Sequence, residues 1–256
     1  MKILLTNDDG IFAPGLRAMR AELQKIGEVT VVAPAGEQSA VGHSITLLNP
    51  LLVEEVREED DFIGYAVEGR PADCVKLGLV QLLKQRPDIL VSGINAGSNA
   101  GINVLYSGTV AAAVEGAFFG VTSIAVSLTL PEVAQYPYAA RLARQVVEDI
   151  LNRDPRPGEL FNVNLPELSK PPRGVRVAEQ GLAFYKEWYD ERTDPRGRKY
   201  YWLLPDNLGP QGETDSDLAN LAEGYVTVTP LQFDLTDRPR LRAMSAWDWR
   251  SLPAAD

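Results

Sequence analysis

The strongest chemical motif of the 256-residue sequence lies where a short apolar run meets two adjacent carboxylates, Asp8 and Asp9, followed by Gly10. The run Lys2–Thr6 is typical of a buried strand. Ligands of open α/β sheets bind beyond the carboxyl ends of the strands, and two adjacent carboxylates repel each other unless a cation lies between them. The motif therefore indicates a metal site. The alternative is an Asx turn or a helix N-cap, which is common for aspartate.

A second loop brings hydroxyl and imidazole groups to the same edge of the predicted sheet. It follows the strand Val29–Ala33 and carries Ser39, His43 and Ser44. The serines can donate or accept hydrogen bonds there, although a serine in a loop rich in glycine and proline is more often a turn residue. His43, the only histidine, is a candidate general acid or base, whereas an isolated histidine more often has a structural role.

A third loop, rich in glycine and asparagine, follows the strand Asp88–Ser92 and includes Asn95, whose side-chain oxygen can complete a ligand set for a hard cation. The next loop, Ser107, Gly108 and Thr109, opens an apolar helix. The N–H groups at a helix N-terminus form an anion site suited to phosphate. The alternative is that Ser107 or Thr109 only caps the helix.

Taken together, these loops predict a hard-metal site beside a phosphate site. Each of them follows a strand or opens a helix, as a parallel sheet requires. Two other phosphate chemistries do not fit. A haloacid-dehalogenase phosphatase needs Asp-x-Asp after its first strand, and a receiver domain needs an aspartate where Asn95 stands and a lysine after a later strand, which Ser127 closes here. No Gly-Lys-Ser/Thr sequence of a P-loop occurs.

Composition narrows the chemistry further. The sequence has 25 Lys and Arg against 35 Asp and Glu, a net charge of −10, which argues against binding of nucleic-acid duplexes or membrane surfaces. Cys74 and His43 are the only residues of their types, which excludes a zinc site with several Cys or His ligands. Oxygen ligands point to Mg²⁺, Mn²⁺ or Ca²⁺. A single cysteine cannot form an intrachain disulfide, which fits a reducing compartment.

The longest apolar stretch, Thr109–Leu130, approaches the length of a membrane span but contains Glu115, two glycines and several hydroxyl residues. We interpret it as a buried helix, Thr109–Phe119, followed by a buried strand, Thr122–Thr129. We therefore expect a cytoplasmic protein without a membrane segment.

The elements that position these loops alternate between strands and helices. Buried strands separated by helices favour βαβ units around a parallel sheet, an α/β fold. Besides the segments named above, the predicted elements are a helix that begins at Pro14 and ends before Gly27, helices over Asp73–Gln85 and Tyr138–Leu151, and a strand over Leu160–Leu165.

The sequence changes character after Pro166. Two aromatic-rich segments, Leu182–Tyr189 and Lys199–Leu204, flank the turn signal Asp194–Gly197 and predict a long hairpin. A lone hairpin is marginally stable in water. We expect it to pack on a neighbouring subunit or, alternatively, on its own monomer as an edge flap. The remaining predicted elements are a short helix over Asp217–Glu223 and a strand over Tyr225–Pro230.

The motifs resemble those of the SurE family of survival-protein 5′/3′-nucleotidases, and they follow the family's order over most of the chain. The resemblance runs through Thr6–Ile11, Ala13–Gly15, Glu37–Ser39, Gly42–Thr46, Pro71–Val75, Ser92–Asn95, Tyr106–Val110, Asn162–Asn164, Asp194–Gly197 and Val228–Leu231.

The resemblance implies a site and an activity. It implies one divalent cation per subunit, Mg²⁺ or Mn²⁺, held by Asp8, Asp9, Ser39 and Asn95. It also implies a phosphate pocket at Asn99 and at Ser107, Gly108 and Thr109. The expected reaction is hydrolysis of nucleoside 5′- and 3′-monophosphates, with short polyphosphate as a further substrate.

The resemblance further implies a Rossmann-like catalytic core, residues 1–166, and a C-terminal extension, residues 167–256, whose β-hairpin and tail join a homodimer or homotetramer. In the expected mechanism Asp8 and Asp9 bind the metal and one of them positions the attacking water. An aspartyl-phosphate route through Asp8 is the less favoured alternative. His43 is the only imidazole candidate for the leaving-group acid.

Two other functions remain open from the sequence. A non-hydrolytic nucleotide-binding regulator would use the same loops, although binding alone does not need a metal with open positions. A nucleotide-sugar transferase has less support, because no Asp-x-Asp follows a strand.

Overall fold

A computed structural model describes residues 1–58, 61–130, 135–182, 188–204 and 214–250. Its strands are β1 (Lys2–Thr6), β2 (Glu28–Pro34), β3 (Val53–Glu58), β4 (Asp61–Val67), β5 (Ile89–Ala96), β6 (Thr122–Leu128), β7 (Leu160–Leu165), β8 (Val175–Val177), β9 (Trp188–Thr193), β10 (Lys199–Leu204) and β11 (Val226–Leu231). Its α-helices are α1 (Pro14–Leu23), α2 (Pro71–Leu77), α3 (Gly108–Phe118), α4 (Tyr136–Leu151), α5 (Asp217–Ala222) and α6 (Arg238–Met244).

A nine-stranded sheet in the order β3-β4-β2-β1-β5-β6-β7-β11-β8 forms the centre of the described residues. The six strands from β4 to β7 in this order pair in parallel. The outer pairs β3–β4 and β7–β11 are antiparallel, and β8 runs parallel to β11. The predicted α/β fold with a mostly parallel sheet is confirmed.

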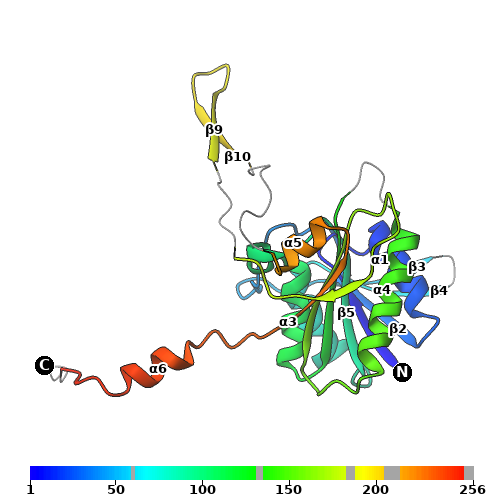
Figure 1. Ribbon diagram of the computed structural model, residues 1–256. Coiled ribbons are helices and arrows are strands. Elements are labelled where there is room, and N and C mark those ends of the chain that lie inside the picture. The colour runs from blue at the N-terminus through cyan, green and yellow to red at the C-terminus, as the bar shows by residue number, and fades with distance from the viewer. Residues whose placement is uncertain (59–60, 131–134, 183–187, 205–213, 251–256) are drawn as a thin grey trace, which may run out of the picture.

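Helices cover both faces of the sheet (Figure 1). Successive side chains of a strand point to opposite faces, so Ile3 and Leu5 pack in the cluster that includes α1 and α4, whereas Leu4 packs in the cluster that includes α2 and α3. Helix α3 consists mostly of small apolar residues, and a Cβ at Gly116 would lie 2.5 Å from Ser123 Oγ on β6. This close packing fixes α3 against the strands whose ends carry the candidate site.

The sequence predictions differ from the structure mainly at the edges of the sheet. The hairpin of β3 and β4 and the short strand β8 were not predicted. The helix predicted over Asp73–Gln85 begins at Pro71 and ends in a π-helical turn, Gly78–Leu82. The helix predicted to reach Gly27 ends at Leu23.

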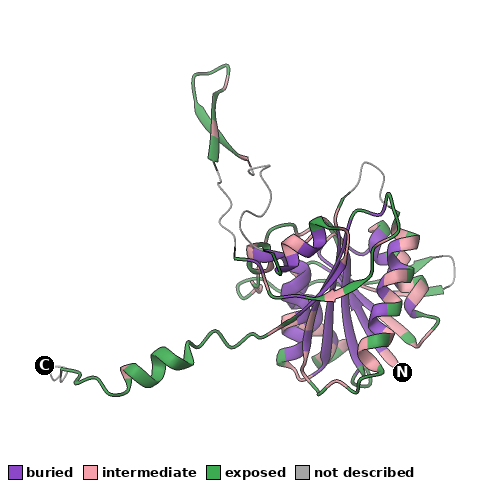
Figure 2. Ribbon diagram, viewed as in Figure 1, coloured by how far each residue is buried: buried purple, intermediate pink, exposed green. Residues whose placement is uncertain are grey.

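The described part of the predicted hairpin forms an isolated antiparallel pair, β9 and β10, around the turn Asp194–Arg198. Its first strand is described from Trp188 to Thr193, and residues 183–187 of the predicted strand Leu182–Tyr189 lie outside the described part. The hairpin and the tail with α6 project from the core and are exposed (Figure 2). Aromatic side chains such as Trp188, Tyr201 and Trp202 are therefore uncovered in the single chain.

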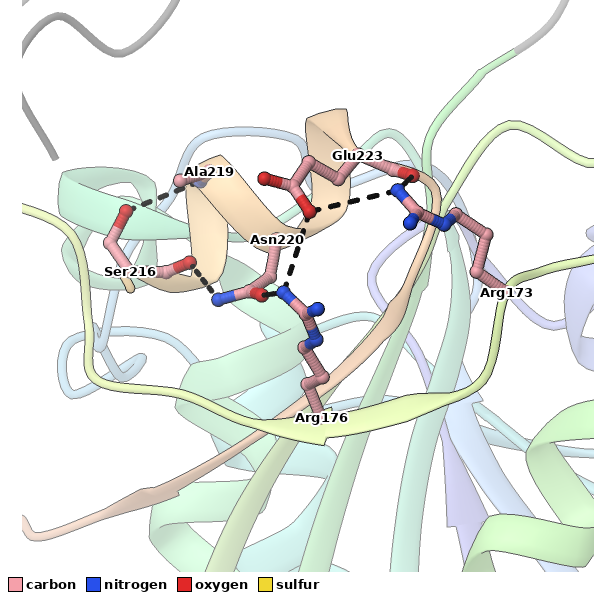
Figure 3. A network of polar contacts seen from close by, with 6 residues as sticks. All are labelled: Arg173, Arg176, Ser216, Ala219, Asn220 and Glu223. Atoms are coloured by element: carbon pink, nitrogen blue, oxygen red, sulfur yellow. Dashed lines mark hydrogen bonds and ion pairs between the residues drawn. The ribbon is translucent and has the colours of Figure 1, made fainter. Parts of the chain in front are cut away.

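Strand β11 and helix α5 return the chain to the sheet after the hairpin. Arg176 of β8 donates a hydrogen bond to Asn220 of α5 at 2.6 Å, and Arg173 and Arg176 both lie within ion-pair distance of Glu223 (Figure 3). Both guanidinium groups also stack on the ring of Tyr225. These contacts join β8, the last strand of the sheet, to helix α5 and the residues after it. They involve none of the predicted site residues.

Over the ranges the structure describes, no helix has the length and apolar character that crossing a membrane requires.

Candidate functional site

The first part of the site is the contact between Asp8, which follows β1, and the N-terminus of α3. The backbone N–H of Thr109 donates a hydrogen bond to Asp8 Oδ2 at 3.1 Å, and the Thr109 hydroxyl donates another to Oδ1. Asp8 is buried, with 6% of its surface exposed. A Cβ at Gly108 would lie 2.8 Å from Asp8 Cβ, so only glycine lets the helix approach this closely. Burial raises the pKa of Asp8, and the Thr109 hydrogen bonds oppose that shift.

Asp9, the neighbouring carboxylate, faces the end of β5. Its Oδ2 accepts a hydrogen bond from the backbone N–H of Ala96 at 3.2 Å. Burial, together with the negative charge of Asp8, raises the pKa of Asp9 to about 6. The charge of Glu37 acts in the same direction on both carboxylates. No ion pair to Asp8 or Asp9 occurs among the residues the structure describes, so their negative charge is not compensated by a side chain there.

Ser39 reaches the same edge through the loop that follows β2. The N–H of Gln38 donates to the carbonyl oxygen of Asp8 at 2.8 Å, which fixes this loop beside the carboxylates. Gly10 has φ of +100°, and a Cβ there would lie 3.2 Å from the Gly36 backbone. The Ser39 hydroxyl donates to Glu37 Oε1 at 2.5 Å, which leaves the lone pairs of its oxygen for a ligand.

Asn95 lies at the end of β5, one residue before the N–H that binds Asp9. The pairing of β5 with β6 shifts in register between Ser92 and Asn95. The Asn95 amide nitrogen donates to the carbonyl oxygen of Gly97 at 2.8 Å, an orientation in which the side-chain oxygen is the group left to accept.

These four side chains form a donor set that fits a hard divalent cation. They supply carboxylate, hydroxyl and amide oxygens, the ligand types of Mg²⁺ and Mn²⁺. Within the described ranges no group of three His, Cys, Asp or Glu residues could hold a metal ion, so neutral oxygens have to complete the set. The two uncompensated carboxylates are the feature that a cation would stabilise.

The residues predicted to bind phosphate have structural partners here. Ser107 caps α3, since its Oγ accepts a hydrogen bond from the Val110 N–H at 3.0 Å, and Thr109 is engaged with Asp8. The side-chain amide of Asn99 donates to Ser127 Oγ at 2.8 Å. Asn162 and Asn164 donate to its carbonyl oxygen. Phosphate binding by these residues stays a prediction. The helix N-terminus still directs its positive end at the site.

His43 makes no contact with Asp8 or Asp9 among the contacts of the described residues. Its Nε2 lies 2.8 Å from Glu115 Oε2, and Lys76 Nζ lies 3.3 Å from Glu115 Oε1. Its loop nevertheless borders the site, because the N–H of Gly42 donates to the carbonyl oxygen of Tyr106 at 3.0 Å.

Sequence reasoning missed three residues that the structure adds to this region. Glu37 acts on both carboxylates through its charge. Tyr136, at the start of α4, has a pKa raised by burial and by the charge of Asp9. Glu115 binds His43. Of these three residues only Glu115 has a signal in the sequence, because it is the one charged residue of an apolar helix.

Comparisons with known proteins agree with the motifs. A family model described as survival protein SurE matches residues 3–187. A 5′-nucleotidase SurE of Rhodopirellula baltica is 52% identical over 255 residues, which are 98% of this chain and 100% of the relative. A 5′-nucleotidase SurE of Syntrophus aciditrophicus is 46% identical over 248 residues, 96% of this chain and 93% of the relative.

A solved structure is also similar. The crystal structure of the Sure protein from Aquifex aeolicus has 39% sequence identity and a TM-score of 0.84, and the alignment covers 96% of this chain and 98% of that one.

Proposed function

The chain belongs to the survival protein SurE family, and from this premise we propose that it is a metal-dependent phosphomonoesterase that acts as a 5′-nucleotidase. The observation that carries the proposal is the pair of adjacent carboxylates Asp8 and Asp9, which have no ion-pair partner among the described residues. The loop of Ser39 is joined to Asp8 by the Gln38 N–H, and the end of β5, where Asn95 lies, is joined to Asp9 by the Ala96 N–H. The relatives named 5′-nucleotidase SurE support the same reaction over nearly the whole chain.

In this proposal the four side chains hold one Mg²⁺ or Mn²⁺ per subunit, which when bound neutralises charge on the phosphoryl oxygens. The chain's own residues do the rest. Thr109 fixes Asp8 through two hydrogen bonds. Asp9, held through one of its oxygens by Ala96, orients the attacking water with the other. The positive end of α3, at Ser107 and Gly108, attracts the phosphate.

The substrate range of the proposal is nucleoside 5′-monophosphates, with 3′-monophosphates and short polyphosphate as further substrates. We also propose a cytoplasmic location, supported by the single buried thiol of Cys74. A homodimer or homotetramer is supported by the uncovered aromatic side chains of β9 and β10, because an isolated hairpin is marginal in water.

The test is phosphate release from a panel of nucleoside 5′- and 3′-monophosphates and short polyphosphates, with Mg²⁺, Mn²⁺ or Ca²⁺. Turnover of at least one nucleotide that depends on a divalent cation supports the proposal. Binding of nucleotide without release of phosphate under every condition would instead identify a non-hydrolytic regulator. Light scattering of the same preparation gives the oligomeric state.

A further inference from the structure

Glu115 is a buried carboxylate in a helix that otherwise has no charged residue. It lies on α3, and only 6% of its side chain is exposed. Burial of an unpaired carboxylate is costly, yet this one has partners on both oxygens, His43 Nε2 at 2.8 Å and Lys76 Nζ at 3.3 Å. Burial raises its pKa, but the contacts with His43 and Lys76 outweigh burial and leave the pKa lowered. Glu115 is therefore an ionised group that the fold places against the imidazole.

Hydrogen bonds hold the loop that carries His43 on both sides of the histidine. On one side the N–H of Gly42 donates to the Tyr106 carbonyl oxygen at 3.0 Å, directly before the first turn of α3. On the other side Thr46 donates from its N–H to Asp73 Oδ1 at 3.0 Å and from its hydroxyl to Oδ2 at 2.7 Å. The loop that carries the imidazole is thus joined to α2 on one side and, on the other, to the turn before α3, the helix whose Thr109 contacts Asp8.

The contact with Glu115 also decides which ring nitrogen is free. Nε2 faces the carboxylate, so Nδ1 is the nitrogen left for another partner, and 41% of the His43 side chain is exposed. Long side chains on a helix lean toward its N-terminus. This direction places the Glu115 carboxylate, which contacts the imidazole, nearer the Asp8 end of α3 than the Glu115 backbone is.

Hydrolysis of a nucleoside monophosphate has to place a proton on the departing nucleoside oxygen, because an alkoxide is a poor leaving group. We propose that Glu115 is a positioning residue that orients the His43 imidazole so that Nδ1 donates this proton. The proposal rests on the phosphomonoesterase function proposed above. The role of Glu115 is separate from the proposed metal binding by Asp8 and Asp9.

The proton balance of this step is closed. The ester P–O bond breaks as the water oxygen bonds to phosphorus, and the departing nucleoside oxygen keeps the bonding electron pair and takes the Nδ1 proton of the imidazolium. The attacking water releases one proton to solvent, and His43 takes one proton back from solvent through its exposed edge, so the two exchanges cancel. The products are nucleoside and hydrogen phosphate, and no oxidant, reductant or further reactant is needed.

The leaving group provides the test. p-Nitrophenolate departs as a stable anion at neutral pH and needs no proton donor, whereas a nucleoside oxygen does. We expect His43→Asn to lower kcat for a nucleoside 5′-monophosphate by about 100-fold or more, in the range of general acids. We expect Glu115→Gln to lower it by about 10–100-fold, as for residues that orient a functional group. Both variants should hydrolyse p-nitrophenyl phosphate at nearly the wild-type rate.

The matched control is Glu22→Gln, because Glu22 is also largely buried and pairs with two cations, Lys25 and Arg144, away from the site. It should change neither rate. Equal losses on both substrates in His43→Asn and Glu115→Gln, or full nucleotide turnover in either variant, would overturn the inference.

The failure of the inference and the failure of the proposed function have different signatures. If the wild-type protein releases phosphate from neither substrate, the proposed function is wrong. If the wild type turns over both substrates and the variants show no dependence on the leaving group, only the role of Glu115 and His43 is wrong. His43→Asn retains the Glu115–Lys76 pair, so it keeps the inference testable even where Glu115→Gln does not fold.

Discussion

Thr109 binds Asp8 through two donors at once, its backbone N–H and its hydroxyl. One anion at the N-terminus of α3 is therefore a side chain of the protein itself, held at the end of β1 and bound to Thr109. This relationship orients one carboxylate before any ligand arrives, and it explains why the turn that was predicted to bind phosphate is adjacent to the carboxylates that we propose bind the metal.

Removal of the Thr109 hydroxyl should weaken the site without disturbing the fold. Thr109→Val keeps the shape of the side chain and the backbone N–H but loses one of the donors to Asp8. We expect a loss of about 10–100-fold in metal affinity or in nucleotide turnover, the usual effect of removing a group that orients a metal ligand. Titration of activity with Mn²⁺ measures it. Thr109→Ser keeps the hydroxyl and should stay close to wild type; an equal loss in both variants would contradict the role of the hydroxyl.

A methyl group at Gly108 should force α3 away from Asp8. The added Cβ would lie 2.8 Å from Asp8 Cβ and 3.1 Å from Pro71 Cγ. We expect Gly108→Ala to destabilise the protein by about 1–3 kcal/mol, as overpacking does, and to lower turnover because Asp8 moves. Gly36→Ala is the stability control, since nothing lies within 4 Å of its added Cβ. Urea denaturation compares the two, and an unchanged midpoint for Gly108→Ala would refute the tight contact.

The sequence predicted the parts of this site that depend on local pattern. Strand ends identify Asp8, Asp9 and Asn95, because a buried run followed by a polar residue is visible in a few residues. The contact between His43 and Glu115 spans 72 residues of sequence and depends on how α3 packs, which no local pattern contains.

Strand β3, at one edge of the sheet, was not predicted because it too depends on a tertiary contact. Strand β3, Val53–Glu58, is mostly exposed and rich in glutamate, which is rare in strands. It forms because β4 offers an unpaired edge. Only the tertiary pairing, and not the intrinsic preference of its residues, makes this segment a strand.

Loss of the metal site should abolish turnover. EDTA is expected to silence the wild-type enzyme, and Mg²⁺ or Mn²⁺ should restore phosphate release. Asp8→Asn should stay inactive even with excess Mn²⁺, because the amide lacks the charge that holds the cation. Phosphate release from a nucleoside 5′-monophosphate is the measurement. Full activity of Asp8→Asn would show that this carboxylate is not a ligand.

The metal-free protein should become more stable as the pH falls from 7 to 5. The pKa of Asp9 is about 6 in the folded protein, whereas the pKa of an unperturbed aspartate is 3.8. The folded state thus binds the proton more tightly, and this contribution to stability is complete below about pH 4 and is lost as the pH rises through 6. For a partly exposed group we expect about 1 kcal/mol between pH 5 and 7.

The measurement for Asp9 is urea denaturation in EDTA at both pH values, with wild type compared with Asp9→Asn. The variant should lack this part of the pH dependence. Asp215→Asn, which alters an exposed carboxylate, should retain it. The prediction is wrong if wild type and Asp9→Asn respond to pH alike.

Asp217 should be essential for the stability of the asparagine-rich loop. Its carboxylate is fully buried and accepts hydrogen bonds from three backbone N–H groups, those of Gly101, Gly181 and Leu218, at 2.9, 2.8 and 2.8 Å. It thereby joins the loop after β5 to the segment after β8. Asp217→Ala leaves the buried N–H groups of Gly101 and Gly181 unsatisfied, as well as the part-buried N–H of Leu218, and each unsatisfied buried group costs about 1–3 kcal/mol. We expect a total loss of about 3–5 kcal/mol, read from urea denaturation, with Asp215→Asn as the exposed control within about 0.5 kcal/mol of wild type. A wild-type midpoint for Asp217→Ala would mean that water replaces the carboxylate, and that the loop does not depend on it.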